Sequence, residues 1–430
     1  MPNLITFLKQ PSSIGLLVLF SLLCVMGRGV GVEIPVQIAV AGYGLAVILC
    51  WPGLGSRNQK QCLFLICSGV FFIGFGLSGG QQFSLETMIS GNLSLVSMLV
   101  AVSFLGLVSA PAVESAKDLP QGTRALRDTL IGVHLLGSVI NLSSVFILGD
   151  RMSSKKPLTR QQAIALTRGF SAAAFWSPFF AAMGVAYTYA PDAKLSTILM
   201  VGIPLGIVAI AITYVELSRH DNVEAFVGYP IHYSSMWLPL LLALCVFGVR
   251  YRQPNFPILT LITLISPTIT VLVLLAKRNK TFTKLRDHTR ERLPTMGNEL
   301  ALFLSAGVFS YGLRLIILSG DGSWLPFDTF GPTQASLCLG AALIAALLGF
   351  HPIITIAVMA PLLTPLNPDH TMLGIVFLAI WALGAAVGPL SGLNLAVQSR
   401  FGIEAISIMR WNLGFCFIMF LVTSMALFLL

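Results

Sequence analysis

Long apolar segments follow one another along almost the whole chain, and they constrain its fold more than any other feature. Stretches of roughly 18 or more apolar residues are long enough to cross the hydrocarbon core of a bilayer as helices, and they recur from residue 14 to the C-terminus. The segments of about ten residues with alternating hydrophobicity that mark a membrane β-barrel do not occur in the sequence. We therefore predict an all-α polytopic membrane protein.

Composition supports this prediction and excludes several classes of protein. Of the 430 residues, 56% are hydrophobic and only 10% are charged, whereas soluble domains carry about 25% charged residues. The net charge of +9 would indicate a nucleic-acid partner only if the basic residues formed a patch on a soluble domain. They lie instead in short loops, so we expect no nucleic-acid partner. The seven cysteines form no CxxC pair, so the sequence predicts neither a zinc site nor a redox motif.

The distribution of Lys and Arg predicts a re-entrant hairpin over residues 129–149. The flanking stretches 111–128 and 150–160 are both basic, and a single crossing between them would place one outside, against the cytoplasmic preference of basic residues. We therefore expect the segment to enter from the cytoplasm and turn back at its polar middle, near Asn141 and Ser144. Such a hairpin is allowed where its tip is buried in protein or lines a wet cavity.

A second hairpin, of opposite entry, is predicted over residues 335–363. Its middle contains Gly349 and His351, and its flanks lack Lys and Arg, so both flanks are expected outside. This topology places the N-terminus on the cytoplasmic side, together with the polar stretch 277–297, which carries seven Lys or Arg. We expect a multi-pass protein of the cell membrane, which in bacteria is the inner, cytoplasmic membrane.

Two further segments contain helix-breaking residues at matching places. Segment 163–190 contains Pro178 and segment 371–399 contains Pro389. Proline removes a backbone donor and clashes with the preceding turn, so each helix should open there. Taken alone each proline is more often a structural kink, but each broken segment follows a predicted hairpin. Inverted repeats with paired broken helices near the midplane point to a transporter binding site.

These features predict four parts along the chain. They are an extra N-terminal transmembrane helix over 1–34, a first inverted repeat over 35–217, a connector over 218–230 and a second inverted repeat over 231–430.

Three stretches carry a resemblance to a known group of membrane proteins: NELALFLSAGVF (298–309), HPIITIAVMAPLLTP (351–365) and WALGAAVGPLSGLNLAVQ (381–398). With the two hairpins and the two broken helices, the chain resembles the ion transporter superfamily, which includes divalent-anion/sodium symporters and arsenite and citrate permeases. The resemblance in architecture covers most of the chain, whereas the resemblance in sequence is confined to these three stretches. It implies that hairpin tips and helix breaks form one site. It also implies an elevator-type movement of a transport domain against a dimeric scaffold, so we expect a homodimer.

The chain departs from this family at the candidate site. Carboxylate-transporting members carry Ser-Asn-Thr motifs at the hairpin tips and helix breaks, whereas this chain has Asn141-Leu142-Ser143 and Ser391-Gly392-Leu393-Asn394. The substrate and the coupling ion are therefore left open.

Candidate ligands follow from the chemistry of an opened helix. A break exposes N–H groups at one new end and carbonyl groups at the other; the first attract anions and the second suit a cation. Hydroxyl and amide side chains can complete either shell, or can instead satisfy the backbone of the turn. The candidate substrate-binding residues are Asn141, Ser143, Ser144, Ser177, Pro178, Pro389, Ser391, Gly392 and Asn394.

Two histidines and two arginines complete the set of candidates. His134 and His351 lie in the hairpins and are candidates for proton coupling, although an intramembrane histidine is more often a hydrogen-bonded packing residue. Arg168 and Arg314 lie in apolar segments, where charges usually face protein or water; whether they face the site or the interface is left open. We expect no metal and no cofactor, apart from Na⁺ or H⁺ as coupling ion.

The sequence therefore predicts a secondary active transporter of a small anionic solute, such as an organic acid, with an elevator-type mechanism coupled to an ion or a proton. A cation/proton antiporter of the same architecture is the closest alternative. The chain contains no GxxxxGK[ST] motif, which argues against an ATP-driven pump. A membrane-embedded enzyme would need clustered acids, histidines or a nucleophile dyad, and a channel would need a continuous pore with rings of polar residues. We therefore predict that the chain is not an enzyme.

Overall fold

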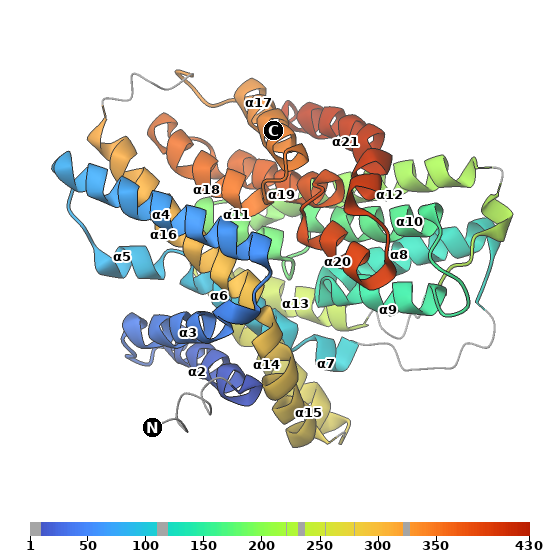
Figure 1. Ribbon diagram of the computed structural model, residues 1–430, viewed down its shortest axis with the longest axis horizontal. Coiled ribbons are helices and arrows are strands. Elements are labelled where there is room, and N and C mark those ends of the chain that lie inside the picture. Colours follow the sequence, from blue (N-terminus) through green and yellow to red (C-terminus); the bar gives the residue numbers. More distant parts are fainter. Residues whose placement is uncertain are drawn as a thin grey trace. The chain divides into compact units, whose positions relative to one another are not determined.

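The computed structural model describes residues 10–109, 119–220, 222–230, 237–253, 255–278, 280–320 and 327–430 (Figure 1). Over these ranges the chain is built from helices, and its one β-bridge pairs Gln121 with Val227. Nine of the described helices are long and apolar enough to cross a membrane. The chain is therefore an all-α polytopic membrane protein, which confirms the predicted fold class.

Parts of three predicted features lie outside the described residues. They are residues 111–118 of the basic stretch 111–128, residues 231–236 at the start of the second predicted repeat, and residues 321–326 in the flank of the second hairpin that is expected outside.

Contacts within the chain divide it into two compact units. Unit 1 consists of Met1–Val108, Leu242–Pro326 and Ala360–Pro365, and unit 2 of Ser109–Leu241, Phe327–Met359 and Leu366–Leu430. Each unit draws on both predicted repeats, so this division groups the segments by contact and does not test their pairing as inverted copies. The repeat boundaries stay a prediction.

Unit 1 is built from helices of the N-terminal hundred residues and of the middle of the chain. They are α2 (Pro11–Gly29), α3 (Val36–Cys50), η1 (Trp51–Gly53), α4 (Ser56–Ser78), α5 (Leu85–Ser90), α6 (Leu93–Ser103), α7 (Gly106–Ser109), α14 (Ile258–Ala276), α15 (Thr281–Asp287), η5 (His288–Arg292), η6 (Leu293–Met296) and α16 (Gly297–Ser319). A further helix, α13 (Trp237–Arg252), contains the boundary between the units.

Helices α4 and α16 lie side by side and run in the same direction (Figure 1). Near the start of the pair Asn58 Nδ2 donates to Asn298 O over 3.0 Å, and at the other end Gln81 Nε2 donates to Leu318 O over 3.0 Å. Glycine allows the close approach between these ends, because a Cβ added at Gly69 would lie 2.8 Å from the Cα of Phe309. Small residues at the contact are how helices pack closely in a membrane.

Two segments of unit 1 differ from their expected form. The apolar segment 88–110 predicts one span, and Leu85–Val108 is one candidate span in the structure, but it is built from the three helices α5, α6 and α7 instead of one continuous helix. The first interruption falls at Gly91-Asn92. There the side-chain amide of Asn92 donates through Nδ2 to Phe303 O over 2.7 Å. Glycine and asparagine are both weak helix formers, so a side-chain bond to a neighbouring helix outweighs their helical propensity.

The polar stretch 277–297 carries no apolar segment and would be read as a loop between spans, but most of it is helical, as α15, η5 and η6. The structure shows an amphipathic segment in which His288 and Thr289 are buried while Arg290 and Arg292 are exposed. The His288 ring lies 4.4 Å from that of Phe104. These tertiary contacts stabilise helical turns that charge alone did not predict.

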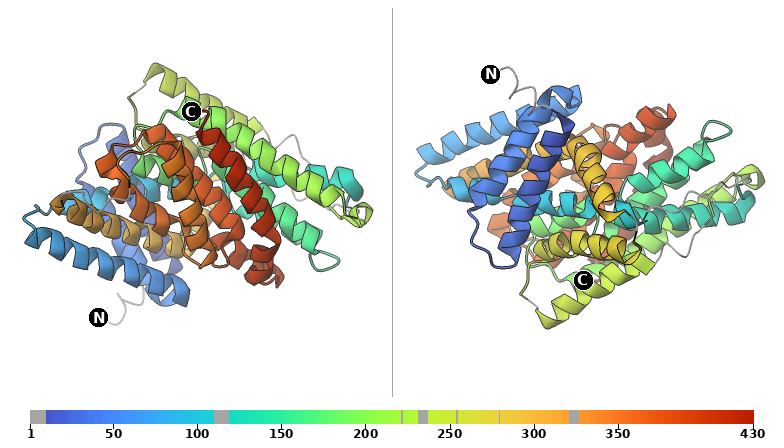
Figure 2. Two further views of the ribbon diagram at one scale, coloured as in Figure 1. Left: turned by 90° about the horizontal axis from the view of Figure 1, so that it is seen from above. Right: turned by 90° about the horizontal axis from the view of Figure 1, so that it is seen from below.

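Helices α2 and α3 lie beside each other in the same unit (Figure 2).

Unit 2 contains the first predicted hairpin, both predicted helix breaks and residues 335–359 of the second predicted hairpin, whose last residues 360–363 belong to unit 1. The helices of unit 2 are α8 (Gly122–Ile140), α9 (Ser143–Met152), α10 (Arg160–Ala172), η2 (Ala173–Phe175), α11 (Ala181–Tyr189), α12 (Leu195–Ser218), η3 (Val223–Ala225), α17 (Pro332–Leu347), α19 (His370–Val387), α20 (Gly392–Phe401) and α21 (Ala405–Leu427), together with the first part of α18 (Pro352–Leu363) and the end of η7 (Thr364–Leu366).

Helix α19 is the central element of unit 2. Every residue of α19 except His370 and Met372 is buried, and the helix packs against α10, α11, α12, α17 and α21. A helix that is apolar on all sides is expected at such an interior position.

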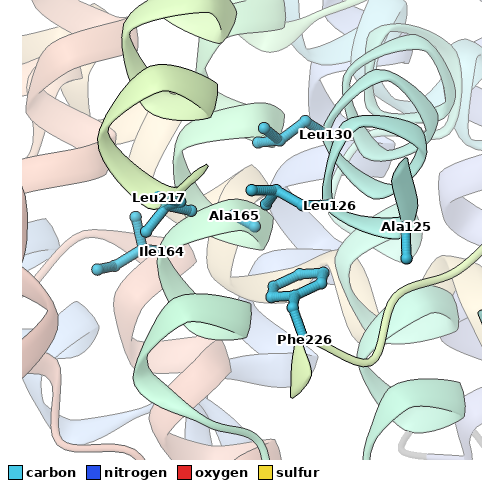
Figure 3. Close-up of a cluster of buried hydrophobic side chains, with 7 residues drawn as sticks. All are labelled: Ala125, Leu126, Leu130, Ile164, Ala165, Leu217 and Phe226. Carbon is cyan, nitrogen blue, oxygen red and sulfur yellow. The ribbon is translucent and has the colours of Figure 1, made fainter. Parts of the chain in front are cut away.

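A cluster of apolar side chains packs the base of α8 against its neighbours (Figure 3). Its members are Ala125, Leu126 and Leu130 of α8, Ile164 and Ala165 of α10, Leu217 of α12, and Phe226 from the segment after α12. Burial of this cluster holds the N-terminal half of α8 against α10 and α12. The turn that follows Ile140 lies at the C-terminal end of the same helix.

Candidate functional site

The first predicted hairpin is a helix–turn–helix in the structure, with α8 ending at Ile140 and α9 beginning at Ser143. Asn141 lies between them with φ 51° and ψ −139°, near the first central position of a type II′ turn, which favours glycine. Its backbone N–H still donates to Gly137 O over 3.1 Å. Ser144 is fully buried and donates to Asn141 O over 2.9 Å, so its hydroxyl satisfies the backbone of the turn.

The first broken helix opens after η2 and resumes at α11. Ser177 is fully buried there; its hydroxyl donates to Ser138 O and accepts from Phe179 N at 3.2 Å. Asn141 Nδ2 in turn donates to Phe179 O over 3.3 Å. The turn of the first hairpin and the first break therefore lie against each other. We call the group Asn141, Ser144, Ser177, Pro178 and Phe179 the first cluster.

His134 lies on α8 beside the first cluster, and both of its ring nitrogens have partners. Nδ1 lies 3.2 Å from Gly169 O, and Trp176 Nε1–H donates to Nε2 over 3.1 Å. A carbonyl can only accept and an indole N–H can only donate. The contacts therefore assign a neutral ring with its proton on Nδ1. This geometry favours the packing interpretation of His134 over proton coupling.

The second predicted hairpin also turns at its expected residues, between α17 and α18. Gly349 has φ +97°, and a Cβ there would lie 2.8 Å from Leu390 Cδ1 in the second break. His351 caps α18, because its Nδ1 accepts from Ile353 N at 3.2 Å. Its ring stands edge-on to Trp381 of α19 with centroids 5.4 Å apart. The second turn therefore contacts the second break at Leu390 and the helix that precedes it at Trp381.

The second broken helix opens at the end of α19 and resumes at α20. Ser391 is the N-cap of α20: its Oγ accepts from Asn394 N at 3.2 Å and donates to Ala385 O over 2.8 Å. One hydroxyl thus satisfies a free N–H of the new helix and a free carbonyl of the old one. We call the group Gly349, His351, Leu390, Ser391 and Asn394 the second cluster.

Asn394 of the second cluster has a buried side-chain oxygen without a hydrogen-bond partner among the described residues. Its side chain is fully buried, and its Nδ2 donates to Ala386 O over 3.2 Å and to Gly388 O over 2.9 Å. The two carbonyl acceptors fix the amide orientation, since a flipped amide would place oxygen against oxygen. Oδ1 is buried and has no hydrogen-bond partner in the described chain. A buried acceptor without a partner costs about 1–3 kcal/mol.

The two clusters come from neighbouring elements, because α19 packs against both η2 and α10. The remaining predicted site residues are Ser143 and Pro389, which are half-buried, and Gly392, which is exposed. In the described residues, no group of three or more His, Cys, Asp or Glu is placed to hold a metal ion.

Three polar residues are joined in a group that the sequence analysis did not assemble, with Arg168 and Asn412 buried and Glu216 exposed. Arg168 of α10 is buried, and it contacts Glu216 of α12 and Asn412 of α21. Asn412 and Glu216 were not singled out; the available signal was a polar residue within each apolar segment. Arg314 is exposed on α16, and its position relative to the membrane interface stays open.

The fold and the two clusters define an all-α polytopic membrane protein with paired helix–turn–helix elements and broken helices in one unit. No protein-family model matches the chain, and no curated protein matches it. Among solved structures, it is similar to the crystal structure of the Alcanivorax borkumensis YdaH transporter, described as having an unusual topology. The identity is 16%, the match covers 87% of this chain and 88% of that one, and the TM-score is 0.48.

Proposed function

We propose that the protein is a secondary active transporter that moves a small anionic solute across the cytoplasmic membrane, coupled to Na⁺ or H⁺. We assign the binding site to the first and second clusters. Both lie in unit 2, so unit 2 is the proposed transport domain of an elevator-type mechanism. Unit 1 is the proposed scaffold, and a homodimer is the proposed assembly. The resemblance to the ion transporter superfamily supports this proposal but leaves the substrate open.

One observation carries the proposal, the buried and unpartnered Oδ1 of Asn394. A fully buried acceptor is normally satisfied by protein or by ordered water. Oδ1 lies at the point where α19 ends and α20 begins, between the carbonyl end of one helix and the N–H end of the next. An amide oxygen beside helix carbonyls suits a small hard cation such as Na⁺, or an N–H or O–H group of a solute.

The opposite charge is favoured at the start of α20 in the same break. The N–H group of Asn394 is capped by Ser391 Oγ, but the N–H groups of Gly392 and Leu393 have no partner within the helix and carry its positive dipole end. Gly392 is exposed, and a Cβ added there would meet no heavy atom within 4 Å. A carboxylate or similar anion can therefore approach these N–H groups directly, while a cation at Asn394 neutralises its charge.

Uptake into proteoliposomes tests the proposal. The purified full-length chain is given a panel of radiolabelled carboxylates, phosphate and arsenite under a Na⁺ gradient, a pH gradient or neither. We expect one class of anion to accumulate under one gradient, and Asn394→Ala to abolish its accumulation. Asn298→Ala is the matched control, because Asn298 is an exposed amide of unit 1 that accepts from Gly55 N at 3.2 Å. Accumulation by Asn394→Ala at the wild-type rate would overturn the assignment of the site.

A cation/proton antiporter is the second candidate, and the same oxygen favours it because an amide oxygen ligates a cation and not an anion. An antiporter needs no organic anion. The test is a NaCl pulse applied to proteoliposomes that enclose a pH-sensitive dye, with no other solute added. Alkalinisation or acidification that Asn394→Ala abolishes would favour antiport, and an unchanged internal pH would favour the anion transporter.

A further inference from the structure

Arg168 is the largest fully buried side chain of the described residues, and every part of its guanidinium is engaged. NH1 and NH2 bind the two carboxylate oxygens of Glu216 over 2.5 and 3.2 Å. NH2 also donates to Trp411 O over 2.8 Å, and Nε donates to Asn412 Oδ1 over 2.8 Å. The carbon of the guanidinium lies 4.6 Å from the centre of the Phe415 ring. The group therefore joins α10, α12 and α21.

Asn412 passes this connection on to the second break. While its Oδ1 accepts from Arg168, its Nδ2 donates to Ala386 O over 2.9 Å. Ala386 O is one of the two carbonyls that hold the amide of Asn394. An unbroken series of hydrogen bonds thus runs from Glu216 through Arg168, Asn412 and Ala386 to Asn394.

The chemistry of this series requires arginine at its centre. Glu216 and Asn412 present their oxygens on two different helices, and the planar guanidinium reaches both with NH1, NH2 and Nε at once. A lysine ammonium keeps the charge but offers donors from one nitrogen only, so it cannot span both. The contact with Asn412 also fixes the orientation of that amide, because only its oxygen can accept from Nε. Arg168 therefore determines that Asn412 presents a donor to Ala386.

We propose that Arg168 is a positioning residue of the second cluster: acting through Asn412, it holds Ala386 O in place and so keeps Oδ1 of Asn394 directed into the site. The proposal rests on the proposed function in one respect, that the end of α19 belongs to the transport site. The hydrogen bonds of the Arg168 guanidinium join it to Glu216, Trp411 and Asn412 and not to either cluster. Its effect on Asn394 is carried by the shared carbonyl of Ala386.

Hydrogen–deuterium exchange of the purified full-length protein tests the proposal without a transported substrate. The reporters are the amides of Gly388, Ser391 and Asn394, whose N–H groups close the second break. In Asn412→Asp the acceptor for Arg168 is retained and the donor to Ala386 is removed. We expect about tenfold faster exchange at the reporters, the change given by loss of one hydrogen bond of typical strength. Exchange in the middle of α19, over residues 375–381, should stay unchanged.

Two substitutions at arginines separate positioning from general destabilisation. Arg168→Lys should accelerate the same three reporters, because the ammonium cannot serve Asn412 and Glu216 together. Arg160→Lys is the matched control: Arg160 lies on the same helix, its guanidinium carbon is 5.4 Å from the centre of the Trp411 ring, and it is exposed. It should leave the reporters at the wild-type rate. Unchanged reporters in Asn412→Asp, or acceleration spread equally over α10, α19 and α21, would overturn the proposal.

Sodium provides a second readout that distinguishes this proposal from the proposed function. In wild type, NaCl in place of choline chloride should slow exchange at the three reporters, and Asn412→Asp should need about tenfold more NaCl for the same protection. If NaCl left the exchange rates of the three reporters unchanged in wild type, this would count against Na⁺ coupling. Faster exchange of the same reporters in Asn412→Asp would still support positioning by Arg168.

Discussion

The indole N–H of Trp176 donates to Nε2 of His134 across 3.1 Å, and this bond joins the first broken helix to α8. Because Nδ1 is engaged by Gly169 O at 3.2 Å, the neutral ring has no free position. Adding a proton to Nε2 would turn two donors toward each other. The relationship makes His134 part of the support for the first cluster.

The first prediction follows from this bond. His134→Asn should lower the free energy of unfolding by about 1–3 kcal/mol, because Trp176 loses a buried partner, while the pH profile of uptake keeps its shape. His351→Asn should change that profile if proton coupling uses this site, since His351 has only its Nδ1 in the cap of α18. Thermal unfolding and uptake measured between about pH 5 and 8, where histidine titrates, check both. If the pH profile of uptake changed in His134→Asn and stayed the same in His351→Asn, His134 would be the residue for proton coupling and not a packing residue.

A second prediction concerns the turn at Gly349. Gly349→Ala should destabilise the protein by about 1–2 kcal/mol from the left-handed backbone alone, and more where the new methyl group meets Leu390. Gly414→Ala is the control, because Gly414 lies in α21 and a Cβ there meets nothing within 4 Å. It should be neutral or stabilise the helix by up to about 1 kcal/mol. Thermal unfolding of both variants in the same detergent makes the comparison, and equal midpoints would contradict the assigned turn.

The sequence predicted the turns and breaks of unit 2 because each is a local event. Proline at 178 and 389 and glycine at 349 weaken a helix through their own backbone geometry. Proline alone does not decide the outcome, because Pro204 and Pro267 lie inside the continuous helices α12 and α14. The basic stretches on either side of residues 129–149 predicted the first turn in the same way. The membrane faces that these elements approach depend on the bilayer, and they stay a prediction.

The connections between segments could not be predicted, because they join residues far apart in the chain. Arg168 and Asn412 are separated by 244 positions, and nothing near either residue indicates the other. The helical form of residues 281–296 depends in a similar way on the burial of His288 against Phe104. The unpartnered Oδ1 of Asn394 is a property of one amide orientation, which only the three-dimensional structure can assign.

A third prediction concerns the parallel pair α4 and α16. Gly69→Val should destabilise unit 1 by at least about 1–3 kcal/mol, the usual cost of overpacking, because the atoms nearest to the new side chain are backbone atoms of Val308 and Phe309. Gly74→Val lies five residues further along the same helix, where a Cβ meets nothing within 4 Å, and it should be tolerated. Yield and thermal unfolding of the two variants measure the difference. Equal loss in both would mean that valine itself, and not the helix contact, is responsible.

The last prediction separates the side chain of Asn141 from its backbone. Asn141→Gly removes the hydrogen bond to Phe179 O, worth about 0.5–1.5 kcal/mol, but it also removes the cost of a positive φ, about 1–2 kcal/mol. Its stability should therefore stay within about 1 kcal/mol of wild type. Asn141→Ala loses the bond and keeps the cost, so it should be the less stable of the two. If the amide binds the transported solute, both variants should lose uptake to the same degree despite this difference. Normal uptake by Asn141→Gly would leave Asn141 with the turn as its only role.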